Sequence, residues 1–204
     1  MRTILFVSLF LLSAPPLLSQ NDTHTFTILM GGTIGDFRVD GGGNFQSLYT
    51  DTKLTPTGFV GLGNGETFLV AKYRIFQASG KSELKNLTAT GRAEWKQTLF
   101  LAGFRLHPEG HSFYFDAMYV ITEAEESIST EDPVVDVLAS SEKLKDKGFA
   151  FTLGLAPRIV GPLALNLEVE YSFMLREAWN RNGDKIPNLG GLYYSAGLSF
   201  YFNN

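Results

Sequence analysis

The stretch LALNLEVEYSFMLR, from Leu163 to Arg176, decides the fold because apolar residues alternate with other residues along its whole length. Side chains on a β-strand point alternately to opposite faces, so this pattern predicts a strand with one wholly apolar face. The opposite face carries two carboxylates and a guanidinium. The alternation is longer than the about five or six residues of an average soluble strand. It reaches the roughly 9–11 residues that a tilted strand needs to cross a bilayer.

Other segments of the chain show the same alternation, which predicts about eight strands in all. The predicted strands are 25–35, 53–62, 67–76, 92–106, 112–122, 149–159, 163–176 and 191–202. The register of 92–106 stays open, because both of its faces are apolar and a β-bulge would account for that. The succession of strands indicates a single all-β domain.

Tight turns alternate strictly with long polar segments between these strands. The turns are predicted at Asn64–Gly65, His107–Gly110 and Gly161–Pro162. The long segments are predicted to be the loops 36–51, 77–91, 123–147 and 177–190. Within the acidic third loop, Asp132–Pro133 predicts the start of a short helix. Short turns at one end and longer loops at the other are typical of an outer-membrane barrel, with the turns in the periplasm.

Alternation alone does not say whether the apolar face points inward or outward. The other face carries small residues and charges of both signs, which suits the narrow lumen of a barrel of about eight strands. These charged residues are Lys72, Arg74, Arg105, Arg158, Asp116, Glu168 and Glu170. We expect them to form an ion-pair network that fills the lumen, rather than a catalytic or proton-conducting array. The predicted fold is therefore an eight-stranded antiparallel up-and-down transmembrane β-barrel with its apolar face toward lipid.

The N-terminal segment predicts that the chain is exported, and the composition excludes several kinds of site and partner. Residues 1–19 are typical of a signal peptide, with candidate cleavage sites after Ala14 and Ser19, and residues 20–204 form the barrel domain. The absence of Cys excludes disulfides, thiolate metal sites and cysteine nucleophiles. A net charge of −4 gives no basic excess that would favour nucleic acid as a partner.

The last predicted strand ends in Gly197-Leu-Ser-Phe-Tyr-Phe202, followed by two Asn residues. Together with the alternation of short turns and long loops, this segment resembles the small eight-stranded outer-membrane proteins of Gram-negative-type bacteria, the opacity-protein and outer-membrane protein X group. The resemblance covers the whole mature chain. It implies a bacterial outer-membrane location, insertion by the barrel assembly machinery, and contact with outer-membrane lipid and lipopolysaccharide. The two Asn residues depart from the strictly terminal aromatic of that group.

A nucleophilic hydrolase would need a Ser or Thr beside a His and an orienting carboxylate. The histidines are His24, His107 and His111, and His111 adjoins Ser112 at a turn predicted to lie in the periplasm, far from extracellular lipid. Lipid A deacylases of this size carry a His and a Ser two residues apart, followed by Asn, on a late strand. No such motif occurs here, so we predict no catalytic residue and no enzymatic activity.

Two acidic groups are candidates for other chemistry. Glu168 and Glu170 share one face of their strand, and we expect them to pair with Arg158 and Arg176. The acidic loop 123–147 lacks the ordered alternation of ligands found in a calcium loop, so a solvated surface is the favoured interpretation. The sequence therefore predicts neither a metal site nor a cofactor site.

The predicted function is structural or surface-directed. It would consist of envelope integrity, adhesion or ligand contact through the four loops, without an open pore. One alternative is a secreted, lipocalin-like barrel that encloses a small apolar ligand, but its outer face would then be unusually poor in Lys and Glu. The other alternative is an outer-membrane lipid-modifying enzyme, which would require a hydrolytic triad.

Overall fold

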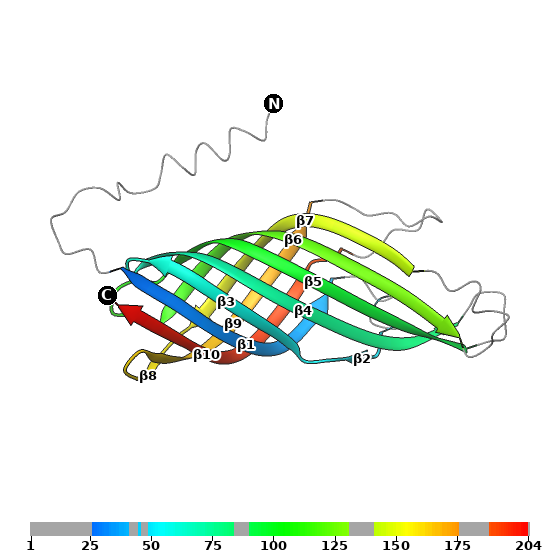
Figure 1. Ribbon diagram of the computed structural model, residues 1–204, viewed down its shortest axis with the longest axis horizontal. Coiled ribbons are helices and arrows are strands. Elements are labelled where there is room, and N and C mark those ends of the chain that lie inside the picture. Colours follow the sequence, from blue (N-terminus) through cyan, green and yellow to red (C-terminus); the bar gives the residue numbers. More distant parts are fainter. Residues whose placement is uncertain are drawn as a thin grey trace, which may run out of the picture.

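The computed structural model describes residues 26–40, 45, 49–83, 90–130, 141–175 and 188–203, and β-strands are its main elements (Figure 1). Several sequence predictions lie outside these described residues: the signal peptide at 1–19, His24, the helix start at Asp132–Pro133, Arg176 and most of the loop 177–190. Among the described residues, no helix has the length and apolar character that crossing a membrane would require.

The strands form one sheet that closes on itself. They are β1 (Thr27–Val39), β2 (Asp51–Thr52), β3 (Thr55–Gly63), β4 (Thr67–Glu83), β5 (Thr90–Leu106), β6 (Phe113–Thr130), β7 (Ser141–Leu155), β8 (Arg158–Val160), β9 (Leu163–Met174) and β10 (Gly191–Asn203). Neighbours pair antiparallel in the order β10–β1–β3–β4–β5–β6–β7–β9, and β9 also pairs with β10. The short strand β2 pairs with β4, and the short strand β8 pairs with β9. The long strands therefore make the closed eight-stranded up-and-down barrel that the alternation predicts (Figure 1).

One end of the barrel, the turn end, carries the three predicted tight turns. They join β3 to β4, β5 to β6 and, through β8, β7 to β9. Each turn contains a glycine with a positive φ, which residues with a Cβ rarely adopt: Gly65 (96°), Gly110 (74°) and Gly161 (53°). Thr27 pairs with Asn203 in the β1–β10 register, so both ends of the described barrel also lie here. The prediction of these turns is confirmed.

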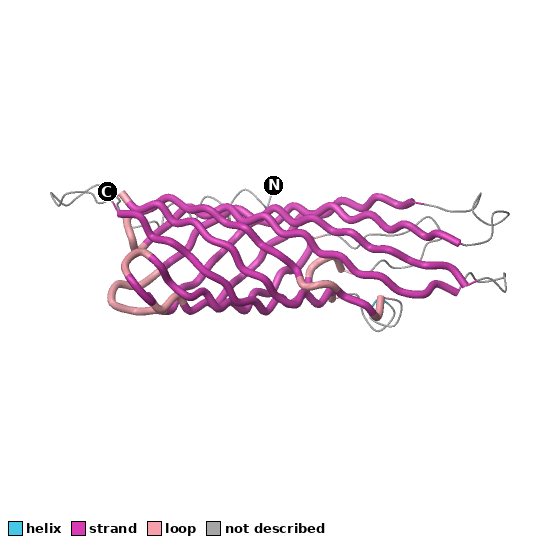
Figure 2. The backbone as a smooth tube through the Cα atoms, turned by 60° about the horizontal axis from the view of Figure 1, so that its bottom comes forward, coloured by secondary structure: helices cyan, strands magenta, loops and turns pink. Residues whose placement is uncertain are grey.

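The opposite end, the loop end, differs from the prediction because five of the long strands continue into segments that the sequence suggests are loops. The predicted loops 36–51, 77–91 and 123–147 are too long, since 36–39, 51, 77–83, 90–91, 123–130 and 141–147 belong to strands. Their outward side chains are polar, as in loops, but most of the buried inward ones are apolar, such as Phe37, Ala78 and Ala124, with Asp146 as an exception. As a result, β4–β7 project beyond the rest of the barrel as a four-stranded sheet, here named the projecting sheet (Figure 2).

Large apolar side chains point away from the barrel on its long strands, and the lumen combines packed apolar side chains with buried charged ones. Leu69 and Leu153 are 59% and 67% exposed, whereas Arg105 is fully buried. The open register of β5 is settled by continuous pairing with both neighbours, without a bulge. Its two apolar faces have different environments: Leu99 and Leu101 on one face fill the lumen, and the other face points outward from the barrel. The prediction of an outward apolar face is thus confirmed.

The outward face changes from apolar to polar at one level of β5, β6 and β7. Phe100, Ile121 and Lys147 are register partners and form the boundary row. The next two rows toward the loop end contain Thr98, Glu123 and Lys145, and then Lys96, Glu125 and Lys143. A change at the same level on adjacent strands is what the surface of a bilayer would impose.

Candidate functional site

Ion pairs link opposite walls of the barrel across its lumen. The Lys72 ammonium of β4 lies 2.9 Å from Asp116, 3.2 Å from Glu168 and 3.4 Å from Glu170. Asp116 belongs to β6 and the two glutamates belong to β9, so none of these carboxylates is on a strand next to β4. All four side chains are almost completely removed from solvent. Lys72 therefore ties three strands together through the lumen.

Two guanidinium groups complete this lumen network. Arg105 Nε and Nη2 donate to the two oxygens of Asp116 at 2.7 and 2.9 Å, which is the bidentate geometry that suits a guanidinium. Arg105 also donates to Glu168 at 3.2 Å. Arg74 Nη1 lies 2.9 Å from Glu170, close as an ion pair but without hydrogen-bond geometry. Three cations thus face three carboxylates, and the network is neutral.

Neutral side chains donate further hydrogen bonds to both glutamates of the network. The Tyr114 hydroxyl and the Asn166 amide donate to Glu168 at 2.6 and 3.0 Å, and the Thr152 hydroxyl donates to Glu170 at 3.1 Å. The guanidinium of Arg105 also lies 3.7 Å from the centre of the Tyr114 ring, a cation–π contact. Buried charges are stable only when they are paired and hydrogen-bonded in this way.

Aromatic residues close the barrel on the loop side of the network. Phe45, Tyr49 and Trp95 pack on one another with ring centres 4.6 to 5.8 Å apart. The Tyr49 hydroxyl donates to Glu126 of β6, and its burial together with this carboxylate raises the pKa of the phenol. Below this aromatic cap, Gln97 donates to the Leu189 carbonyl at 2.6 Å. Side chains therefore block the axis of the barrel at the cap as well as at the lumen network.

The expected pairing of lumen charges is confirmed for six of the seven residues, but Arg158 is an exception. It lies exposed on β8, where its guanidinium is 5.8 Å from the centre of the Tyr201 ring. The prediction that Glu168 and Glu170 pair with Arg158 is therefore wrong, since their partners are Lys72, Arg74 and Arg105. Arg158 follows Pro157 in a separate short strand, so the alternation counted from β7 does not reach it.

The two described histidines belong to a polar recess of about 560 Å³ at the turn end. His107 Nε2 lies 2.9 Å from the His111 carbonyl oxygen, and burial with the nearby Arg105 and Arg158 lowers the pKa of His107. Ser112 contributes its carbonyl oxygen to a bond from the Ala156 amide. Among the described residues, no three His, Asp or Glu side chains are grouped so that they could hold a metal ion.

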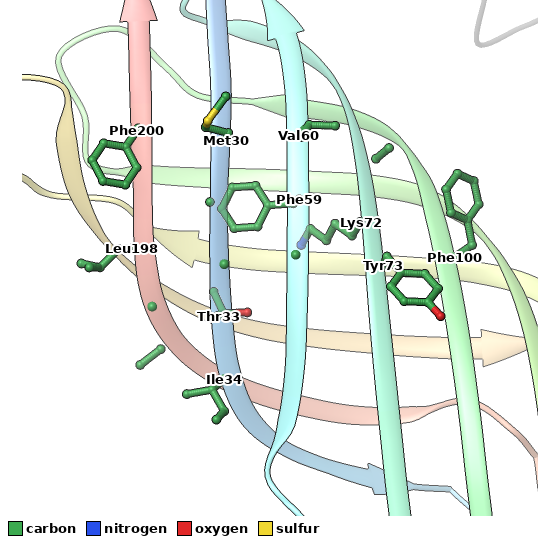
Figure 3. A pocket seen from close by; sticks show the side chains of 16 residues that line it. Met30, Thr33, Ile34, Phe59, Val60, Lys72, Tyr73, Phe100, Leu198 and Phe200 are labelled. Atoms are coloured by element: carbon green, nitrogen blue, oxygen red, sulfur yellow. The ribbon is translucent and has the colours of Figure 1, made fainter.

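A groove of about 970 Å³ crosses the outward faces of β10, β1, β3 and β4 (Figure 3). Its walls are the apolar side chains Met30, Ile34, Val60, Tyr73, Phe100, Leu198 and Phe200. Between them the outward positions of β1 and β3 are Gly32 and Gly58, which are register partners. This groove was not predicted from the sequence, although outward glycines among outward apolar residues are the signal that could have indicated it.

No protein-family model matches the sequence, and no curated protein matches it significantly. Among solved structures, Ail, the attachment invasion locus protein of Yersinia pestis in complex with the heparin analogue sucrose octasulfate, is similar with a TM-score of 0.54 and 10% identity, over 88% of this chain and 100% of Ail. Neisserial surface protein A gives a TM-score of 0.44 at 10% identity, over 87% of this chain and 97% of that one. The N-terminal β-barrel domain of Pseudomonas aeruginosa OprF gives 0.39 at 10% identity, over 88% and 98%. The similarity to Ail shows that this chain has the fold of the small outer-membrane barrels, as the resemblance implied.

Proposed function

We propose that this protein spans the bacterial outer membrane as a closed barrel and contacts molecules outside the cell through its projecting sheet. The turn end would face the periplasm and the loop end the exterior. The proposal includes the predictions that residues 1–19 are a cleaved signal peptide and that the barrel assembly machinery inserts the chain. It also assigns no catalytic role to any residue.

The outer surface supports the membrane location. Outward side chains between the turn end and the boundary row are predominantly apolar, and beyond this row they are charged or polar on β5, β6 and β7. The lumen, by contrast, contains charges instead of an apolar cavity. This distribution is the reverse of what a lipocalin-like carrier needs, because such a carrier would keep its apolar face inside.

The lumen supports a protein that does not conduct. Lys72, Arg74 and Arg105 are paired across the lumen with three carboxylates, and the aromatic cap of Phe45, Tyr49 and Trp95 lies on the loop side of this network. Side chains normally fill the interior of a barrel with about eight strands. The function is therefore to be sought on the surface of the protein.

The observation that carries the proposal is the length of the projecting sheet. β4 has 17 residues and β6 has 18, whereas β3, the neighbour of β4 outside the projecting sheet, has 9. At about 3.3 Å per residue, the excess of β4 over β3 corresponds to roughly 26 Å of strand beyond what a crossing needs. Such an extension exposes an ordered surface to the exterior, which a purely structural barrel would not require.

The charges of the projecting sheet suggest a first class of ligand to test. Its described outward side chains from the boundary row onward are more basic than acidic: Arg92, Lys96, Lys143, Lys145 and Lys147 against Glu94, Glu123 and Glu125. Some of these form exposed pairs, such as Lys145 with Glu123 at 2.5 Å. Exposed ion pairs are weak, so a polyanion could replace the glutamates as the partner of the lysines. Since Ail was solved with a heparin analogue, heparin is a reasonable first probe.

The test shortens the projecting sheet without disturbing the barrel. Joining Ala78 to Trp95 and Ala124 to Leu144 by Asn-Gly turns preserves the register, because these residues are cross-strand partners. The shortened protein keeps Lys96, Lys145 and Lys147, so these three residues are also replaced with Gln. Cells that display the full-length protein should bind heparin-coated beads, and the doubly shortened protein with these replacements should not. Variants with one shortened hairpin serve as controls. Equal binding by the full-length and the doubly shortened protein would refute the proposed role of the sheet.

A further inference from the structure

The groove across β10, β1, β3 and β4 exists because small residues replace bulky ones on an otherwise bulky outer surface. A Cβ added to Gly58 would meet nothing within 4 Å, and one added to Gly32 would only touch the Thr57 carbonyl oxygen at 3.4 Å. Neither glycine is therefore required by crowding at its own position. The neighbouring outward residues Ala71 and Ala196 widen the same depression. Figure 3 shows large outward side chains on both sides of it, and the buried Thr33, Phe59 and Lys72 between them.

The groove extends from the loop-side boundary of the apolar surface toward its middle. On β5 it reaches Phe100, which belongs to the boundary row. On β1 it extends from Met30 to Ile34, and the next outward residues, Asp36 and Arg38, are charged. On β10 it covers Ala196 to Phe200. In a barrel that spans a bilayer, the loop-side part of the groove is beside the lipid tails of the leaflet on the loop side. In the proposed orientation, that leaflet is the outer one.

We infer that the groove binds an acyl chain of lipopolysaccharide in the outer leaflet. The groove is continuous with the surface that faces the bilayer, and its lining is predominantly apolar apart from the buried Thr33 and Lys72. A flexible chain can follow a depression between fixed side chains and make dispersion contacts along its whole length. The acyl chain stays in an apolar medium when it binds. The dispersion contacts therefore select the site, and the hydrophobic effect does not. The inference rests on the proposed function for the orientation of the barrel and the identity of the lipid.

A second copy of the protein fits the groove less well than a lipid chain. Two copies related by a two-fold axis would place groove against groove, and two concave surfaces leave the space between them unfilled. A head-to-tail contact would have to insert a bulky strand face between Met30, Val60 and Leu198, whereas the barrel surface is broad and convex. The glycines therefore match a thin occupant better than another barrel.

The experiment fills the groove and counts the lipid that stays bound. Gly58→Leu places a side chain where the structure has open space, so the barrel should fold normally. The matched control is Ala117→Leu, which enlarges an outward residue of β6 outside the groove. Each protein is extracted from outer membranes in mild detergent, checked for its heat-dependent gel migration, and examined by native mass spectrometry for bound lipopolysaccharide and phospholipid.

The wild type and Ala117→Leu should retain lipopolysaccharide, and Gly58→Leu should retain roughly tenfold less, because its side chain displaces the contacts of several methylenes. Equal retention in all three proteins would overturn the inference, and so would retention of phospholipid alone. A wild-type dimer that Gly58→Leu dissociates would show that a second copy occupies the groove. A protein absent from the membrane fraction would refute the proposed function itself, which separates that failure from a failure of the groove.

Discussion

Replacing Lys72 with Met should destabilise the barrel more than any other single substitution in its lumen. The Lys72 ammonium lies within 3.4 Å of three carboxylates, and its side chain is fully buried. Without it, Asp116, Glu168 and Glu170 would share only the two guanidinium groups and would leave one negative charge uncompensated. Removing one partner of a buried ion pair costs about 3–5 kcal/mol, because the other partner stays buried.

A second substitution separates charge imbalance from lost packing. Lys72→Met combined with Glu170→Gln leaves two cations and two carboxylates, so the double variant should recover at least about half of the lost stability. The surface variant Lys145→Met is the matched control, since its exposed pair with Glu123 should contribute less than about 1 kcal/mol. The difference between the lumen and surface variants isolates the effect of burial.

The measurement is urea unfolding of the purified barrels in lipid vesicles, followed by tryptophan fluorescence. Trp95 lies in the buried aromatic cap, so its emission should report loss of the folded barrel. A Lys72→Met variant within about 1 kcal/mol of the wild type would refute the view that the network is a tightly coupled unit. A double variant that is less stable than the single one would refute the role of charge balance.

Three further substitutions test other parts of the fold. Gly31→Ala should cost about 1–3 kcal/mol of unfolding free energy, because its Cβ would lie 2.5 Å from the Phe59 ring. The control Gly58→Ala should be nearly neutral. A neutral Gly31→Ala would contradict the close packing. Because the pKa of His107 is lowered, the folded state binds fewer protons than the unfolded state at mildly acidic pH. The free energy of unfolding should therefore fall as the pH drops below about 6.5. His107→Phe should flatten this pH dependence in unfolding curves. Tyr49→Phe should lose about 1 kcal/mol and shift the fluorescence of the cap, and an unchanged spectrum would argue against the bond to β6.

The sequence predicts the barrel well because one physical rule repeats on every strand. Alternation assigns the inward and outward faces, and the turn glycines mark one end. The loop end was harder to predict for the same reason. There the outward residues, such as Glu123 and Lys145, are as polar as those of a loop, and only the inward Trp95 and Ala124 continue the pattern. A strand that leaves the bilayer loses its apolar face but keeps its pairing.

The lumen network could be predicted only in its composition. Alternation places Lys72 and Glu168 inside, but their strands are not neighbours, and the tilt and stagger of the barrel decide which inward residues meet across it. The sequence carries no direct signal of that stagger. Tyr114, Asn166 and Thr152 have inward positions as well, yet their role as partners follows only from the closed geometry. The groove was not predicted because it depends on residues of five strands that are brought together only in the closed barrel.

The central claim is that alternate residues of each strand face lipid up to a sharp boundary at the loop side. The natural chain has no Cys, so single cysteines can be introduced at each position from 143 to 155 of β7 and spin-labelled in vesicles. Labels at 149, 151, 153 and 155 should be accessible to oxygen dissolved in lipid, and labels at 143, 145 and 147 to a water-soluble nickel reagent. Labels at 150, 152 and 154 should be protected from both. A lack of alternation, or nickel access along the whole outward face, would contradict a lipid-facing barrel.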